Sequence, residues 1–327
     1  ALTENPIAVL LTEPGYLGTI SDLPALIEVA HNKKVPVILD AAWGGHFGFH
    51  PQLPRHAIQL GADALITSTH KALPGYSASA LLLARTEFLS AERLEQSFET
   101  THTTSPAGAP LASIDGVRAL LQMRGEELIG ALLENIHAFK ESVQAEFALP
   151  IFLYPTDFPA GRFDPTKIVL RVQQLGASGV DIEEDLQAAG IRVEMADRDT
   201  IVFLGTIADS KEDFTHLADV LIPILKRRQE QRRESATALS WSVTPQKKLS
   251  MRDAYFAKTE MVAAASALGR VSADLIAPYP PGVAVVAPGE VLTQQIIEGL
   301  TSSRAAGVRI AYATDSTLAQ YRVVLES

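Results

Sequence analysis

Two short apolar runs within residues 37–74 constrain the fold of this chain more than any other feature. The run VPVIL ends at Asp40, and the run ADALIT ends at the polar sequence STHK, residues 68–71. The stretch between the runs, residues 50–62, has the length of a crossover helix with its loops. A strand, a crossover and a second parallel strand make up the βαβ unit. The pattern therefore predicts an α/β fold with a mostly parallel sheet.

Asp40 and Lys71 are the residues in this unit that suggest chemistry. Ligands of such sheets bind beyond the carboxyl ends of the strands, so we expect both side chains to project into one pocket. Partial desolvation behind an apolar strand favours a neutral amine, which can form an imine with an aldehyde. A nearby carboxylate can keep a pyridine nitrogen protonated. The pair suits a Schiff-base lysine beside such an acid.

The motifs around this pair resemble those of a known enzyme family. The sequence D-x-A-W at residues 40–43, together with HFGFHPQLP and GADALITSTHKALPG, resembles the cofactor site of the Orn/Lys/Arg decarboxylases. This resemblance implies an aspartate-aminotransferase-like (fold type I) architecture and pyridoxal 5′-phosphate (PLP) as the cofactor. It also implies decarboxylation of lysine, arginine or ornithine to a diamine or agmatine.

The resemblance assigns roles to individual residues. Lys71 would carry PLP and Asp40 would face its ring nitrogen, so these two are the predicted catalytic residues. Ala42 would let the flat ring approach, and Trp43 would lie beside the cofactor or the substrate carboxylate. The predicted cofactor-binding residues are Asp40, Ala42, Trp43, Ser68, His70, Lys71 and Thr103, with Ser68 and His70 at the phosphate.

Thr103 belongs to a T-T-S-P motif that the family also carries. By resemblance, this threonine reaches across a dimer interface to the phosphate of the partner's cofactor, and Thr104 is the alternative match. A homodimer, or a larger assembly of dimers, is therefore expected.

The chain divides into three predicted domains: a partial PLP-binding large domain with its connecting helix (1–149), a small α/β domain (150–235) and a C-terminal decarboxylase domain (236–327). Within them we expect buried strands at residues 7–12 and 76–85, a helix at 20–33 capped by Ser21, and a helix at 86–100 with Ser90 as an internal cap. The DPTK sequence contains Asp164 and Lys167, to which we assign structural roles.

The sequence GRVSADLIAPYPPGVAVVAPGEVLT, residues 269–293, resembles the C-terminal domain of the same family. A carboxylate there would select the cationic tail of a basic amino acid. Glu290 is the first candidate for this substrate contact, and Asp274 is the second.

Composition excludes several other classes of function. A net charge of −10 argues against a surface for nucleic acids or anionic membranes, and no apolar run approaches the length of a membrane span. The chain contains no cysteine and shows no signal peptide, which fits a cytoplasmic protein. His46 and His50 are not expected to bind a metal, because Gly48 breaks any helix between them and no third ligand is apparent.

Alternatives to the decarboxylase remain. The chain opens at Ala1 in the middle of a strand-like pattern, whereas the family carries a preceding segment. We therefore expect a fragment, and the alternative is that another chain supplies the missing half. An aminotransferase or aldolase of the same fold is the nearest competing enzyme, and its carboxylate-binding arginine would be Arg162, Arg171 or Arg192. A non-catalytic partner of a complete subunit is the third reading.

Overall fold

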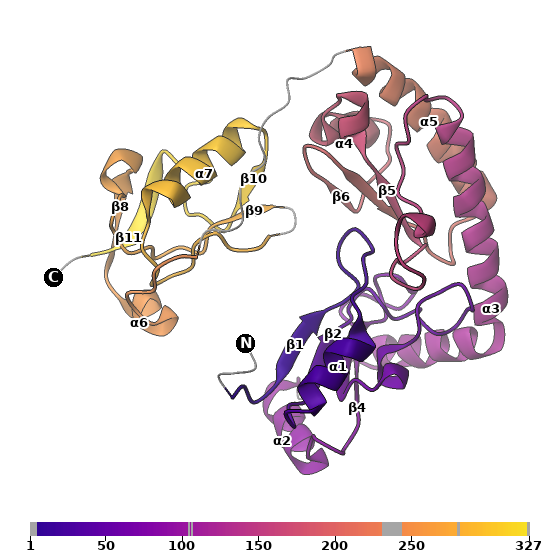
Figure 1. The fold of residues 1–327 in the computed structure, drawn as a ribbon, viewed down its shortest axis with the longest axis horizontal. Coiled ribbons are helices and arrows are strands. Elements are labelled where there is room, and N and C mark those ends of the chain that lie inside the picture. The colour runs from indigo at the N-terminus through magenta and orange to yellow at the C-terminus, as the bar shows by residue number, and fades with distance from the viewer. Residues whose placement is uncertain (1–4, 104, 106, 231–243, 280–281, 326–327) are drawn as a thin grey trace. The chain divides into compact units, whose positions relative to one another are not determined.

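The computed structural model describes residues 5–103, 105, 107–230, 244–279 and 282–325 (Figure 1). The chain forms two compact units. The first comprises residues 1–170 and 202–223, and the second comprises residues 171–201 and 224–327. The three domain ranges expected from the sequence stay predictions, and the boundary at residue 235 lies outside the described residues.

The first unit contains a four-stranded sheet in the order β1-β2-β3-β4. Strands β1 (Val9–Thr12), β2 (Val37–Asp40) and β3 (Ala64–Ser68) run parallel, and β4 (Ala80–Ala84) pairs with β3 in the antiparallel direction. The predicted mostly parallel sheet is therefore confirmed. Its register sets Asp40 opposite Thr12 on one side and opposite Ile66 on the other, so the carboxyl ends of the three parallel strands meet at one edge.

Helix α1 (Leu23–His31) begins at Asp22, whose Oδ1 accepts a hydrogen bond from the backbone N–H of Ala25 at 3.2 Å. The predicted cap, Ser21, is wrong because the helix begins at Leu23, so Asp22 occupies the cap position. The apolar side of the helix packs on one face of the sheet. The resulting core contains Leu23, Ile27, Ala30, Val37, Leu39, Ala41, Ala57, Ala62 and Leu65.

The opposite face of this sheet is open among the described residues. Leu10 is 70% exposed, Leu82 is 48% exposed and Ile66 is 39% exposed. The prediction that the strands at residues 7–12 and 76–85 are buried is therefore wrong for this chain. A continuous apolar run indicates burial on both faces, but α1 covers only one of them.

The stretch between β2 and β3 contains no α-helix in the structure. It forms only the 3₁₀ helix η2 (Ala57–Leu60), so the expected crossover helix is wrong. Pro51 and Pro54 explain the difference, because each lacks a backbone N–H and disfavours a helical conformation in the residue before it.

Two helices complete the first half of the chain. Helix α2 (Ala91–Thr101) begins at Ser90, whose side chain accepts a hydrogen bond from the N–H of Arg93, so this serine starts the helix instead of interrupting it. Helix α3 (Gly108–Gln144) has 37 residues. At 1.5 Å per residue it is about 55 Å long. A long helix is therefore present where the sequence predicted one, and its role in connecting two domains stays a prediction.

The next segment alternates strands and helices, as the sequence predicted for a small α/β domain. Strands β5 (Lys167–Leu170), β6 (Met195–Ala196) and β7 (Ile201–Leu204) form a sheet in the order β5-β7-β6. The helices are α4 (Gly179–Ala188) and α5 (Lys211–Glu230), and short 3₁₀ helices lie at Pro155–Asp157 and Val172–Leu175. The charged run at residues 226–235 begins within α5, and its second half lies outside the described residues.

The C-terminal segment has its own core. Strand β8 (Thr259–Ala263) pairs with β11 (Gln320–Val324), and β9 (Ala277–Tyr279) pairs with β10 (Arg309–Ala311), both antiparallel. Helices α6 (Met251–Phe256) and α7 (Gln294–Ala305) and the 3₁₀ helix Ala264–Ser266 accompany them. Pro280 and Pro281, within the stretch that resembles the family's C-terminal domain, lie outside the described residues. Among the described helices, none combines the length and apolar character needed to cross a membrane.

Candidate active site

Asp40 is the last residue of β2, and its side chain is exposed. The preceding residue, Leu39, points into the core beneath α1, so alternation along the strand directs Asp40 to the open face. Its Oδ1 atom accepts a hydrogen bond from the backbone N–H of Ala42 at 3.1 Å. The carboxylate is thus oriented by the loop that follows it, and its exposed side remains accessible to a ligand.

Lys71 follows β3 and is also exposed, so the partial desolvation expected for its amine is wrong for this chain. Its Nζ atom lies 5.0 Å from the centre of the Trp43 indole. Because Trp43 belongs to the loop that begins at Asp40, the structure brings together the loops that follow two adjacent parallel strands. The register places the ends of the two strands side by side, and this contact joins the loops that follow them. The expected shared pocket for Asp40 and Lys71 stays a prediction.

Trp43 has two further neighbours. The ring of Tyr16 lies 5.8 Å from the indole, centre to centre, with an angle of 55° between the planes. The Nζ atom of Lys167 lies 3.3 Å from the indole centre, and the side chain of Lys167 is fully buried. A desolvated cation over an aromatic face contributes about 2 kcal/mol. Sequence reasoning missed this contact, because nothing in the DPTK motif indicates that its lysine reaches the loop after β2.

A buried polar cluster fixes the far end of that loop. The Nε2 atom of His46 lies 3.2 Å from Oδ1 of Asp164 and 3.1 Å from Oγ1 of Thr166. Oδ1 of Asp164 also accepts hydrogen bonds from the N–H and the hydroxyl of Thr166. Burial alone would raise the pKa of Asp164, but the charge of His46 and the hydrogen bonds from Thr166 outweigh it and hold this pKa below the usual 3.8.

The loop after β3 is held by Ser79. Oγ1 of Thr69 lies 2.6 Å from Oγ of Ser79, and Nδ1 of His70 lies 2.8 Å from the carbonyl oxygen of the same residue. Gly75 packs so closely that a Cβ there would lie 2.2 Å from the carbonyl oxygen of Thr69. Ser68 is nearly buried at the end of β3. This loop is the one that carries Lys71, so its tight packing limits where the amine can go.

The remaining predicted residues lie elsewhere. Thr103 is exposed, and its hydroxyl accepts a hydrogen bond from the N–H of Ser105 at 3.3 Å, while Thr104 lies outside the described residues. In the second unit, the carboxylate of Glu290 accepts a hydrogen bond from the N–H of Ala287 at 2.7 Å. Asp274 is buried and pairs with Arg322 at 2.7 Å. The roles given to Thr103 and Glu290 stay predictions.

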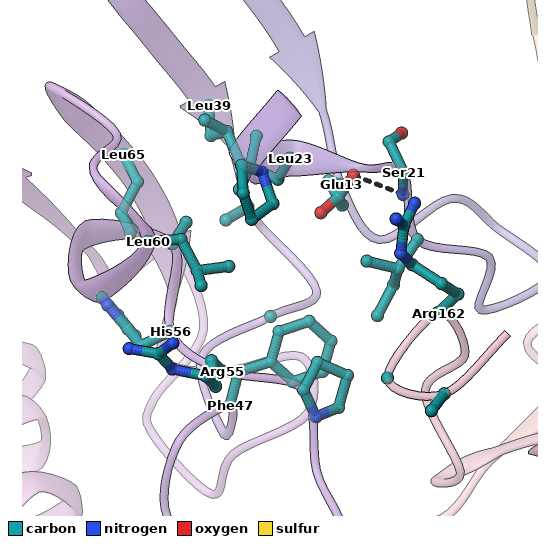
Figure 2. A pocket seen from close by; sticks show the side chains of 18 residues that line it. Glu13, Ser21, Leu23, Leu39, Phe47, Arg55, His56, Leu60, Leu65 and Arg162 are labelled. Carbon is teal, nitrogen blue, oxygen red and sulfur yellow. Dashed lines mark hydrogen bonds between the residues drawn. The ribbon is translucent and has the colours of Figure 1, made fainter. Parts of the chain in front are cut away.

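A separate pocket of about 290 Å³ lies in the first unit, on the helix-covered side of the sheet (Figure 2). Its apolar wall includes Leu39 and Leu65, and across from them the carboxylate of Glu13 accepts a hydrogen bond from the N–H of Ser21 at 2.8 Å. Burial raises the pKa of Glu13, although Ser21 and the charge of Arg162 oppose it. Since Asp40 points to the opposite face, this pocket is distinct from the strand-end site.

The strand-end residues fit a flat, aldehyde-bearing pyridine cofactor. The open carboxylate of Asp40 and the exposed amine of Lys71 follow adjacent strands, and Ala42 is too small to block a ring between them. These groups provide a proton-holding acid and a nucleophilic amine, which such a cofactor needs. Two polar groups precede Lys71 in the chain: the hydroxyl of Ser68, at the end of β3, and the imidazole of His70, in the loop that follows.

Comparisons with known proteins show the family to which the chain belongs. The chain matches the Orn/Lys/Arg decarboxylase major domain over residues 1–157 and the C-terminal domain of the same family over residues 229–309. It is 33% identical to an arginine decarboxylase of Bacillus subtilis over 335 residues, covering all of this chain and 68% of that protein. It is 30% identical to an arginine decarboxylase of Halalkalibacterium halodurans, again covering 68% of the relative.

A solved structure of the constitutive lysine decarboxylase of E. coli has a similar fold. The match covers 98% of this chain and 58% of that one, with a TM-score of 0.77 and 20% sequence identity. At this identity the likeness shows the fold alone. The chain therefore spans about two thirds of the length of the arginine decarboxylases that it resembles, and a smaller share of the lysine decarboxylase.

Proposed function

The chain belongs to the Orn/Lys/Arg decarboxylase family, and we propose that it acts in the PLP-dependent decarboxylation of a basic amino acid: lysine, arginine or ornithine. The observation that carries the proposal is the meeting of two loops at one sheet edge. The exposed amine of Lys71 reaches the indole of Trp43, in the loop that begins at the exposed carboxylate of Asp40.

PLP, when bound, supplies an aldehyde that reacts with an amine, and a ring that accepts electrons when the substrate loses its carboxylate as carbon dioxide. The Nζ atom of Lys71 is the amine that would hold the aldehyde, and the same atom can return a proton afterwards. The carboxylate of Asp40 would hold a proton on the pyridine nitrogen, since an opposite charge favours the charged form. Ala42 would leave room for the ring, and Trp43 would cover one side of it and exclude water. Ser68 and His70 would bind the phosphate.

Arginine is the first substrate to test, because the relatives at 30% identity or more are named arginine decarboxylases. Lysine is next, because relatives of lower identity are lysine decarboxylases. The product would be agmatine or a diamine. By resemblance, Glu290 would contact the cationic tail of the substrate, Thr103 would reach the partner's cofactor in a homodimer, and the enzyme would act in the cytoplasm.

The test is carbon dioxide release from arginine, lysine and ornithine, each supplied separately to the purified chain with PLP. Release from one of them, with the matching amine as product, supports the proposal. Formation of an oxo acid without carbon dioxide, when a 2-oxo acid is supplied as the amino acceptor, would instead indicate an aminotransferase of the same fold. Release of glycine and an aldehyde from a β-hydroxy amino acid would indicate an aldolase. A chain that neither binds PLP nor releases carbon dioxide would be a non-catalytic partner or fragment.

A further inference from the structure

Trp43 lies beneath two ammonium groups from distant parts of the first unit. One belongs to Lys71, which the proposed function uses, and the other to Lys167, which it does not. The Nζ atom of Lys167 is the nearer, at 3.3 Å from the indole centre against 5.0 Å for Lys71. A buried lysine placed this close to a residue of the candidate site calls for a specific role.

The backbone around Lys167 fixes the base of its side chain. Its N–H donates to the carbonyl of Asp164 at 3.1 Å, and the N–H of Asp164 donates to the carbonyl of Gly18 at 2.8 Å. Gly18 has a φ of +82°, and a Cβ there would lie 3.0 Å from the Cβ of Lys167. The loop after β1 therefore packs against the stem of Lys167, and the side chain extends from this anchor to Trp43.

Lys167 and Trp43, the two partners of this contact, differ in how firmly the surrounding structure holds them. Lys167 is fully buried and anchored at its stem, whereas Trp43 belongs to a loop and is only partly buried. A cation over an aromatic face holds the ring by electrostatic attraction, which is strongest where water is excluded. The lysine is thus the fixed partner, and the indole is the group whose position depends on the contact.

We propose that Lys167 is a positioning residue: its ammonium holds the Trp43 indole in place, and the indole in turn keeps the amine of Lys71 at the strand ends. The second half of this statement rests on the proposed function. The first half concerns the chain without cofactor and can be tested separately.

The first experiment measures how well water-borne acrylamide quenches Trp43 fluorescence. The chain has two tryptophans, so a Trp241→Phe background leaves Trp43 as the single emitter. In this background and without PLP, Lys167→Met and Lys167→Gln should raise the quenching constant about twofold, because the ring is no longer held against a buried cation. Lys167→Arg keeps a cation and should stay nearer to the parent value.

A matched control is Lys140→Met. Lys140 is another buried lysine of the same unit, and its Nζ atom lies over Tyr154 instead of Trp43. Its replacement should leave the quenching of Trp43 unchanged. Far-ultraviolet circular dichroism establishes that each variant is folded. Two folded neutral variants at Lys167 that both show the parent quenching constant would overturn the proposal.

A second experiment leaves Lys167 unchanged and therefore stands even if those variants do not fold. Brief acetylation of the intact chain, followed by peptide mass spectrometry, should modify the exposed Lys71 but spare Lys167. In Trp43→Leu the indole no longer covers the Nζ atom of Lys167, so Lys167 should become acetylated several-fold faster, while the exposed Lys33 serves as the internal standard. Unchanged protection of Lys167 in this variant would refute the contact.

These readouts separate the two proposals. If the chain fails to react with PLP but Lys167 variants release Trp43, the function is wrong and the positioning role stands. If PLP binds but the quenching constant of Trp43 does not change in the Lys167 variants, the positioning role is wrong. Where both hold, Lys167→Met should slow the appearance of the visible absorption band of bound PLP, and Lys167→Arg should restore most of the rate.

Discussion

His46 and Asp164 form a buried hydrogen-bonded pair, with Nε2 of the first 3.2 Å from Oδ1 of the second. The pair joins the loop after β2 to the residue at the start of the DPTK motif. Because both side chains are withdrawn from water, removing one partner would leave the other without this buried hydrogen bond.

Asp164→Asn should lower the free energy of unfolding at pH 7 by about 3 kcal/mol, because it breaks a buried pair. The pKa of Asp164 is lower in the folded than in the unfolded chain, so its contribution is present above the usual pKa of 3.8 and is lost as the pH falls through the folded value. Urea unfolding between pH 7 and pH 2 should show this loss for the parent chain. A variant with the same acid dependence as the parent would contradict it.

Lys140 gives a second pH dependence, of opposite origin. Burial lowers the pKa of its ammonium from 10.5 to about 8, against the attraction of Asp164 and Asp157. Between these values the unfolded chain binds more protons, so stability should rise as the pH increases from 8 to 10.5. The rise should be on the order of 3 kcal/mol. It should disappear in Lys140→Met and persist in Lys33→Met, whose side chain is exposed.

Gly75→Ala should destabilise the chain by about 2 kcal/mol or more, because the new methyl group would lie 2.2 Å from the carbonyl oxygen of Thr69. The control is Gly116→Ala, at an exposed helical position where a Cβ meets nothing within 4 Å. That change should stabilise the chain by up to about 1 kcal/mol. Thermal unfolding of both variants measures the difference, and equal effects would refute the packing described for the Lys71 loop.

Lys71→Ala should abolish the visible absorption band that PLP gives with the purified chain, because the amine proposed to hold the aldehyde is gone. Lys33→Ala removes an exposed lysine of the same unit and should leave the band intact. Titration of each variant with PLP under identical conditions provides the comparison. A normal band in Lys71→Ala would assign the cofactor to another lysine.

Glu290→Gln should raise the KM for a basic substrate about tenfold while changing kcat less, since it removes a charge that would attract the cationic tail. Glu298→Gln, at an exposed acid in the same C-terminal segment, is the matched control. An unchanged KM would leave Glu290 with the structural role seen here, as an acceptor for the N–H of Ala287.

The parallel strands and their polar ends were predictable because apolar runs and terminal polar residues are local signals. Asp40 and Lys71 follow directly from them. The exposure of β1 and β4 was not predictable in the same way, because an apolar run does not reveal whether a second layer covers the sheet. The expected crossover helix is absent for another reason: residues 50–62 are long enough for a helix, but Pro51 and Pro54 disfavour one.

The contacts around Trp43 and His46 could not be obtained from spacing. Lys167 and Asp164 are more than a hundred residues away from these partners in the chain, and the DPTK motif in which they lie was assigned a structural role. That assignment describes Asp164 correctly as a packing and hydrogen-bonding residue. It did not anticipate that the same short segment reaches two positions of the loop after Asp40.

This arrangement has a consequence for synthesis on the ribosome, where the amino-terminal part of a chain emerges and begins to fold first. Strands β1 to β4 can pair before residues 164–167 have been translated. Until then, the loop that carries Trp43 and His46 lacks its contacts with Lys167 and Asp164. A nascent chain halted after residue 157 would therefore contain all four of these strands, but the loop after β2 would still lack its two buried partners.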